Sequence, residues 1–173
     1  MNINNGLFTS EAVSAGHPDK LCDRISDAIL DEFLVRDKHA RVACETFAAD
    51  GKIIVAGEFR TKNPQHFKQV EELTPEIVRR TLRQIGYGTQ ELDIDPDTCE
   101  IEVRFNHQSP QIAAGVDQAD QVLGAGDQGL MFGYASDETP HLTPLAWTLA
   151  TALIAEGTKL VHQPNSVLRP DAK

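Results

Sequence analysis

Long apolar runs and an excess of positive charge are both missing from this sequence of 173 residues. No apolar stretch approaches the length that spans a membrane, and residues 1–10 have neither the basic start nor the apolar core of a signal peptide. A formal net charge of -10 argues against nucleic acid as the main partner, because that binding depends on a basic surface. We therefore expect a soluble, cytoplasmic protein that binds neither membranes nor nucleic acid.

Cysteine is also scarce. The three cysteines, Cys22, Cys44 and Cys99, are widely separated, and none belongs to a C-x-x-C pair. This spacing indicates neither a disulfide framework nor a cysteine zinc site. We expect all three thiols to be reduced and mainly structural.

Local patterns in the first third of the chain predict a helix and a β-hairpin. Apolar residues recur near helical spacing over residues 19–36, and Pro18 suits the first position of that helix. The apolar or alternating runs 41–48 and 52–59 are joined by Asp50-Gly51, a strong signal for a two-residue hairpin turn.

Caps, alternation and glycines predict the remaining elements. These are a helix from Thr74-Pro75 to Gly86, a strand over 100–105, a glycine- and amide-rich loop over 106–129, a short strand over 130–134, and a helix from Thr143-Pro144 through Trp147 to Gly157. Loops as long as residues 106–129 are usually functional or mobile in compact domains. Because no β-α-β rhythm is evident, the pattern favours the α+β class, with a mixed or antiparallel sheet and helices packed on one face.

Gly124, Gly126 and Gly129 have the spacing G-x-G-x-x-G, which surrounds a pyrophosphate in dinucleotide-binding folds. That motif requires a buried strand before the first glycine and a helix at the last one. Residues 115–121 are polar and indicate a loop, and residues 130–134 suit a strand better than a helix. The spacing alone is therefore weak evidence for a dinucleotide site.

The predicted hairpin places two glutamates on one face of its sheet. If Asp50-Gly51 is the turn, Glu45 and Glu58 each lie opposite an alanine and are diagonal neighbours roughly 7 Å apart. Like charges in this arrangement repel, and a bound cation or ammonium group would relieve the repulsion. The face is therefore either washed by solvent or part of a pocket for a positive ligand.

Residues 16–20, Gly-His-Pro-Asp-Lys, precede the first predicted helix. A helix N-terminus favours anions, Lys20 adds a positive charge, and Asp19 is able to hold a divalent cation that bridges to them. A metal triphosphate fits this chemistry. The alternative is that His17 and Asp19 only cap the helix. A Ser/His/Asp hydrolase is less well supported, because no nucleophile-elbow pattern accompanies His17.

Four segments together resemble one enzyme family. They are LFTSEAVSAGHPDK (7–20), RVACET (41–46), GAGDQGLMFGYA (124–135) and LRPDAK (168–173). In this order they closely resemble the S-adenosylmethionine synthetases, or methionine adenosyltransferases, of which GAGDQG is a signature. An unrelated acidic α+β binding domain would require four ordered matches to be accidental. The resemblance assigns the glycines to that family's active site, which is unrelated to the Rossmann fold.

The resemblance implies a reaction and its cofactors. In the family, the methionine sulfur displaces the triphosphate of ATP from C5′, and the triphosphate is then hydrolysed to pyrophosphate and phosphate. Magnesium and basic side chains stabilise the charge that builds on the leaving group, and no covalent enzyme intermediate is required. The resemblance further implies Mg²⁺ and K⁺ as cofactors, and a homodimer or a tetramer formed by two dimers, with the active site between subunits.

The nucleotide-binding residues are carried over by the same resemblance. His17 looks like the catalytic residue that contacts the ATP phosphates near the reacting centre, and Lys20 looks like a further catalytic phosphate contact. The ending Asp171-Ala172-Lys173 resembles an ATP-binding segment.

Methionine and metal ligands are implied in the same way. Asp19 resembles the magnesium ligand and Glu45 the potassium ligand. Glu58 resembles the acid that binds the methionine ammonium group, and Gln108 a second methionine contact. Asp127 is expected to lie close to the substrates.

Family members are more than twice this length and have three similar α+β subdomains. The chain resembles the N-terminal subdomain (1–105), a segment with the active-site loop and glycine-rich signature (106–129, with the mobile loop at 108–118), and the beginning of the central subdomain (130–173). The family's later glycine-rich phosphate segment is not among these residues.

Two expectations follow from this partial match. The chain alone should be inactive, and it should either associate or be poorly stable, because helix faces at Leu145, Leu149 and Ile154 would lack partners. The alternative to an enzyme is a catalytically incomplete fragment that binds or regulates full-length subunits.

Overall fold

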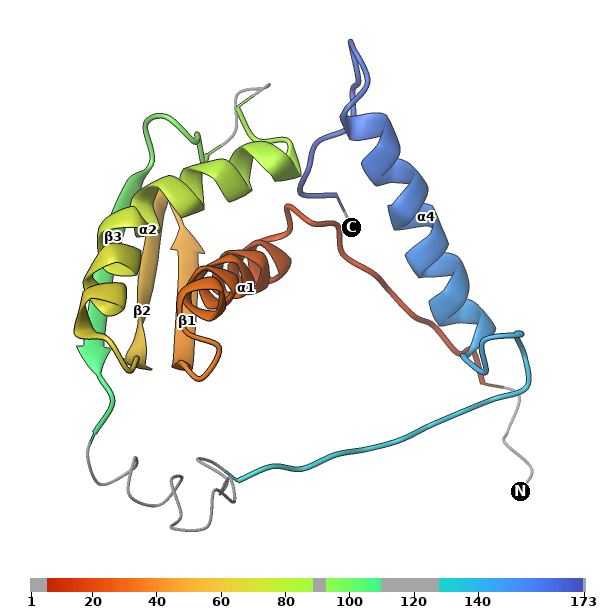
Figure 1. The fold of residues 1–173 in the computed structure, drawn as a ribbon. Coiled ribbons are helices and arrows are strands. Elements are labelled where there is room, and N and C mark those ends of the chain that lie inside the picture. Colours follow the sequence, from red (N-terminus) through yellow and green to blue (C-terminus); the bar gives the residue numbers. More distant parts are fainter. Residues whose placement is uncertain (1–5, 89–92, 110–127, 173) are drawn as a thin grey trace.

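The computed structural model describes residues 6–88, 93–109 and 128–172. Within these ranges the elements follow in the order α1 (Pro18–Arg36), β1 (Arg41–Ala49), β2 (Lys52–Arg60), α2 (Pro64–Ile85), β3 (Glu100–His107) and α4 (Leu145–Val161) (Figure 1). The α+β class is confirmed: three helices accompany a three-stranded mixed sheet of order β1-β2-β3. Among the described residues, no helix is long and apolar enough to cross a membrane.

Helix α1 forms where its apolar spacing predicts it. Pro18 occupies the first turn, and His17 is the N-cap residue, whose side chain accepts a hydrogen bond from the Asp19 N–H. One face of the helix is fully buried through Leu21, Ile25, Ile29 and Phe33. Because these residues recur every four positions, they form a single stripe toward the sheet.

The hairpin has the predicted register. Asp50 and Gly51 both have positive φ, 49° and 73°, as a tight two-residue turn requires. Glu45 therefore pairs with Ala56, and Glu58 with Ala43. This outcome confirms that the two glutamates lie on the same face of the sheet.

Strand β3 pairs with β2 in parallel, although no β-α-β rhythm was expected from the sequence. The β2-α2-β3 segment is a β-α-β unit, because parallel neighbours need a long crossover and α2 supplies it. A hairpin and a parallel crossover thus share one sheet, which makes the sheet mixed.

Both α1 and α2 cover the same face of the sheet (Figure 1). The buried side chains of that face include Ile53, Val55 and Phe59 of β2. The Phe59 ring lies between Phe33 of α1 and Phe105 of β3, with centroid distances of 4.9 and 4.2 Å. This aromatic cluster joins a helix to two strands and forms the centre of the hydrophobic core.

The predicted start of α2 at Thr74-Pro75 is wrong. The helix begins earlier, with Asn63 as N-cap and Pro64 in the first turn, and its end is as predicted. Pro75 lies inside the helix, where it cannot donate a backbone hydrogen bond. The Thr74 hydroxyl donates to the Val70 carbonyl at 2.8 Å. Burial of the apolar face of the preceding turns offsets the cost of an internal proline, so a cap signature appears in the middle of a helix.

The expected strand over 130–134 is also absent. These residues have no regular secondary structure, and Figure 1 shows them crossing a region with no neighbouring strand. A strand needs a partner for its backbone hydrogen bonds, and the described residues supply none here. The helix predicted after Thr143-Pro144 is confirmed as α4 and continues beyond Gly157 to Val161. None of its residues is buried, and Leu145 and Leu149 are exposed as expected, whereas Ile154 is half-buried.

We expect Phe59→Ala to lower the free energy of unfolding by about 3–5 kcal/mol, because it removes the ring at the centre of the aromatic cluster and leaves a cavity. Urea denaturation followed by circular dichroism measures this change. Phe47→Ala is the matched control: Phe47 is 64% exposed on the uncovered face, so its loss should change stability by only about 0.5 kcal/mol. Equal losses for the two variants would contradict this description of the core.

Candidate functional site

The start of α1 lies beside the last residues of the chain. The Ser14 N–H donates to the Ala172 carbonyl at 3.0 Å, and the Gly16 N–H donates to the Pro170 carbonyl at 2.9 Å. A Cβ atom at Gly16 would come within 2.4 Å of the Pro170 oxygen, so this close approach requires glycine. Pro170 is buried in the contact, whereas the Asp171 side chain is exposed. The pairing therefore brings residues 170–172 alongside residues 14–16, which directly precede His17.

His17 and its neighbours present polar groups at the first turn of α1. The His17 Nδ1 atom accepts from the Asp19 N–H at 3.3 Å and lies 3.9 Å from the Asp19 carboxylate. The His17 side chain is only 18% exposed, whereas that of Asp19 is 92% exposed. Lys20 contacts Asp23 at 3.2 Å and remains half exposed. An imidazole, an exposed carboxylate and an ammonium group thus lie at one helix N-terminus, which suits an anion accompanied by a cation.

A groove runs between α1 and β1 and connects this helix start to the sheet. Its lining includes Lys20, Asp23, Ser26 and Asp27 of α1 and Cys44, Glu45 and Thr46 of β1. The Ser26 and Thr46 hydroxyl groups are hydrogen-bonded at 2.8 Å and hold its two sides together. Glu45 therefore shares a groove with Lys20, which links the proposed potassium ligand to the proposed phosphate contacts.

Glu58 and Gln108 lie toward one end of the uncovered face of the sheet. Glu58 is exposed and pairs with Ala43 on one side and Asn106 on the other. The Gln108 N–H donates to the Phe59 carbonyl at 3.0 Å and so extends the β2-β3 ladder. The Gln108 Oε1 atom is buried and has no hydrogen-bond partner among the described residues. It is a free acceptor next to the carboxylate-bearing strand.

The structure gathers the candidate residues into two groups. His17, Asp19 and Lys20 lie at the start of α1, residues 170–172 pair with the loop before it, and Lys20 shares the groove with Glu45. Glu58 and Gln108 do not line that groove. Lys173, Asp127 and residues 110–118 of the expected mobile loop lie outside the described residues, as do Gly124 and Gly126.

The described part of the chain contains no cluster of three or more His, Cys, Asp or Glu side chains arranged to hold a metal ion. Acids are nevertheless frequent in the groove, whose lining includes Asp23, Asp27 and Glu45. Any cation bound here would have to take some ligands from a substrate or from water.

One residue of this region was missed by sequence reasoning. Tyr87 is buried, and its O–H donates to the Gly16 carbonyl at 2.6 Å. Burial raises the pKa of Tyr87 to about 12, and the nearby negative charge of Asp171 adds to this effect. The two residues of the hydrogen bond are 71 positions apart, so no local pattern could have found it.

Comparison with known proteins gives two family-model matches that together account for most of the chain. Residues 5–110 match the model described as "S-adenosylmethionine synthetase, N-terminal domain", and residues 122–173 match the model described as "S-adenosylmethionine synthetase, central domain".

Curated relatives agree with these matches. The chain is 46% identical to the S-adenosylmethionine synthase of Mesoplasma florum, with 96% of this chain and 43% of the relative covered. It is 48% identical to that of Cereibacter sphaeroides, with coverage of 100% and 43%. For Mycoplasma capricolum the identity is 45%, with coverage of 91% and 39%. The chain therefore spans less than half the length of the curated relatives it matches.

We expect Cys44, although it lines the groove, to react slowly with alkylating reagents. Burial raises the pKa of Cys44 to about 11, and the charge of Glu45 contributes in the same direction. Since the thiolate is the reactive form, iodoacetamide at pH 8 should modify Cys44 roughly a hundredfold more slowly than an unstructured cysteine peptide. Mass spectrometry of a time course measures the rates. Modification of Cys44 as fast as the peptide would show a nucleophilic thiol in the groove.

Proposed function

The chain belongs to the S-adenosylmethionine synthetase family, and from this premise we propose that its residues act in the synthesis of S-adenosylmethionine from ATP and L-methionine. The observation that supports the proposal is the pairing of residues 14–16 with 170–172, because it brings the segment that contains Asp171 and Ala172 against the residues directly before His17. The proposed nucleotide ligands come from two distant parts of the sequence, and the backbone pairing of these parts supports a shared role.

His17 is proposed as the donor to the leaving group. Its Nδ1 atom already accepts a hydrogen bond from the Asp19 N–H, so the neutral ring carries its proton on Nε2. The Nε2–H group is then free to donate to the triphosphate oxygen from which C5′ departs. As the methionine sulfur forms its bond to C5′, the C5′–O electron pair passes to that oxygen, and a positioned donor stabilises the growing charge. Lys20 adds a positive charge to the same end.

Magnesium fits this end of the molecule. Asp19 offers a carboxylate that is 92% exposed in the first turn of α1. Magnesium bound to nucleotides usually takes only one or two protein carboxylates, together with phosphate oxygens and water. Asp19 is proposed to supply such a ligand beside His17. When bound, the ion would neutralise part of the triphosphate charge.

The groove and the uncovered sheet face are proposed to hold the monovalent cation and methionine. Glu45 offers a carboxylate in a groove that also contains the hydroxyl oxygens of Ser26 and Thr46, and hard cations prefer oxygen ligands. Glu58 would pair with the methionine ammonium group, while the unpartnered Gln108 oxygen accepts a second N–H from the same group. The positive ligands would offset the repulsion between the two glutamates.

The chain is proposed to comprise the N-terminal subdomain over 1–105, the active-site loop and glycine-rich signature over 106–129, and the beginning of the central subdomain over 130–173. The remaining subdomains of the family fold would complete the site, in an oligomer whose active sites lie between subunits. Asp127 and Lys173 are proposed to contact the substrates or ATP from these segments.

A second candidate function is a binding or regulatory partner of full-length subunits. It is favoured by one observation: α4 buries none of its residues and exposes large apolar side chains such as Leu149 and Leu153. Apolar surfaces of this kind commonly mark sites of association. The two candidates differ in what the chain does when mixed with other subunits.

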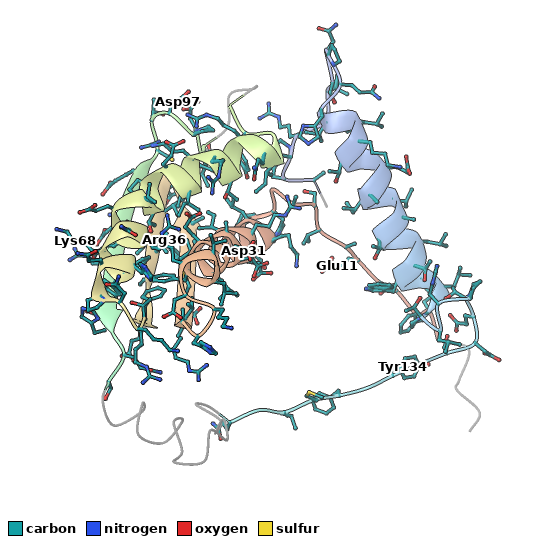
Figure 2. The ribbon with its side chains drawn as sticks, in the orientation of Figure 1. Glu11, Asp31, Arg36, Lys68, Asp97 and Tyr134 are labelled. Carbon is teal, nitrogen blue, oxygen red and sulfur yellow. The ribbon has the colours of Figure 1, made fainter. Side chains whose placement is uncertain are left out.

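Mixing the chain with a second chain that carries the remaining subdomains should restore synthesis of S-adenosylmethionine from ATP and methionine, in the presence of magnesium and potassium. His17→Asn and Asp19→Asn should each lower the rate of the mixture by roughly a hundredfold or more, since a donor or metal ligand at the transition state is lost. Asp31→Asn is the matched control, because Asp31 is an exposed acid of the same helix (Figure 2). Its rate should be unchanged.

Either of two results would overturn the enzymatic proposal. The first is a mixture that forms no product although the two chains bind one another. The second is dose-dependent inhibition of an intact synthetase by the chain, which would favour the regulatory candidate.

Glu58→Gln should raise the KM for methionine by roughly 10- to 100-fold in the same mixture, because a charge-assisted hydrogen bond to the ammonium group is lost. The KM for ATP should stay within about twofold of its original value. Glu76→Gln, at an exposed acid of α2, is the control and should change neither constant. An increase confined to the KM for ATP would place Glu58 at the nucleotide instead.

A further inference from the structure

Tyr87 connects the end of α2 to the loop that carries His17. Helix α2 ends at Ile85 and is capped by Gly86, whose φ of 113° allows the chain to turn. The Tyr87 N–H donates back to the Leu82 carbonyl at 3.1 Å. These contacts fix the backbone of Tyr87 on the rigid helix, and the side chain then reaches the Gly16 carbonyl at 2.6 Å.

The N–H and C=O groups of Gly16 are both hydrogen-bonded in this arrangement. The Gly16 N–H donates to the Pro170 carbonyl, and the Gly16 C=O accepts from the Tyr87 hydroxyl. The following residue, His17, donates its own N–H to the Ser14 carbonyl at 3.1 Å. The backbone immediately before the His17 side chain is therefore held by groups from α2, from the C-terminal segment and from its own turn.

Burial strengthens this connection. Tyr87, Gly16, Ser14 and Pro170 are all buried, so water is not available to replace a lost hydrogen bond. The Ser14 hydroxyl also donates to the Pro170 carbonyl. Because the pKa of Tyr87 is about 12, the phenol keeps its proton and remains a donor throughout the neutral range.

We propose that Tyr87 is a positioning residue, which holds the Gly16–His17 peptide and residues 170–172 in the mutual arrangement that the nucleotide requires. This inference rests on the proposed function for its ligand, Mg-ATP, but the hydrogen-bond network itself is independent of that function. The hydrogen bond of the Tyr87 side chain goes to the Gly16 carbonyl and not to the side chain of His17 or Asp171. It acts on them through the backbone of Gly16.

Removal of the hydroxyl should loosen one end of the network and leave the helices intact. In Tyr87→Phe the buried Gly16 carbonyl loses its donor, while the ring still fills its place in the core. Local openings of the 14–16 and 170–172 pairing then become more frequent, because one of the bonds that oppose them is gone. The positions of His17 and Asp171 become less well defined as a result.

The experiment compares Tyr87→Phe with two controls in the 173-residue chain. Thr81→Val removes a buried hydroxyl of α2, which donates to the Ile77 carbonyl of the same helix at 2.9 Å. Tyr134→Phe makes the same chemical change on the exposed segment after the loop (Figure 2). Amide hydrogen exchange measured by NMR reports local opening, and calorimetric titration with Mg-ATP reports nucleotide affinity.

We expect Tyr87→Phe to speed exchange at the Ser14 and Gly16 amides at least fivefold relative to Thr81→Val, and to weaken Mg-ATP binding at least threefold more. Tyr134→Phe should change neither quantity. Equal exchange rates at these amides in Tyr87→Phe and Thr81→Val would overturn the inference. Faster exchange with unchanged Mg-ATP affinity would also overturn it, since the bond would then be structural only.

The failure of the proposed function looks different. If the unaltered chain binds no Mg-ATP, its proposed role in nucleotide binding fails for the chain by itself. The exchange rates at Ser14 and Gly16 still decide whether Tyr87 holds the loop. Selective acceleration supports the positioning role, and its absence refutes it.

Discussion

The two-residue turn at Asp50 and Gly51 sets the register on which the rest of the molecule depends. Both residues have positive φ, so the turn twists in the sense that the flanking strands need. A shift of one residue would place Glu45 and Glu58 on opposite faces of the sheet and bring Val55 to the face of Glu45. The register thus decides at once which face α1 and α2 cover and which face presents the carboxylates. Structure and proposed chemistry share this single constraint.

Local rules explain why the hairpin and α1 could be predicted from the sequence. The turn residues of the hairpin, and the cap, first-turn proline and apolar stripe of α1, act within a few residues. Each of these signals indicates only one structure at its position. The prediction of the start of α2 was wrong because Thr74-Pro75 carries the same cap signature inside a longer helix. Burial of the earlier turns outweighs the proline there, and burial is not a local property. The prediction of a strand over 130–134 was wrong for a related reason: the composition suits a strand, but a strand needs a partner for its backbone hydrogen bonds.

In the candidate site, too, local features could be predicted from the sequence and long-range contacts could not. The helix start around His17 follows from a short motif, and the diagonal placement of Glu45 and Glu58 follows from the turn. The contact between residues 14–16 and 170–172 does not follow from either, because it joins the two ends of the chain. Roles for Asp171 and Ala172 came from a family resemblance, and the structure supplies the neighbourhood that spacing alone could not. Tyr87 carried no signal at all, since its partner at Gly16 lies 71 positions away.

The two groups of candidate residues also differ in how they are supported. Around His17 the backbone is enclosed by buried hydrogen bonds, so the imidazole is oriented before any ligand arrives. Glu58, in the second group, instead stands on the uncovered sheet face that it shares with Glu45, and neither glutamate has a basic partner opposite it in the hairpin. The helix start is therefore held in place by its hydrogen bonds, whereas a positive ligand would lower the repulsion between the carboxylates of the sheet face. Under the proposed function, a chain of net charge -10 joins an organised helix start, proposed to bind the polyphosphate, to an acidic face that would favour the ammonium-bearing substrate.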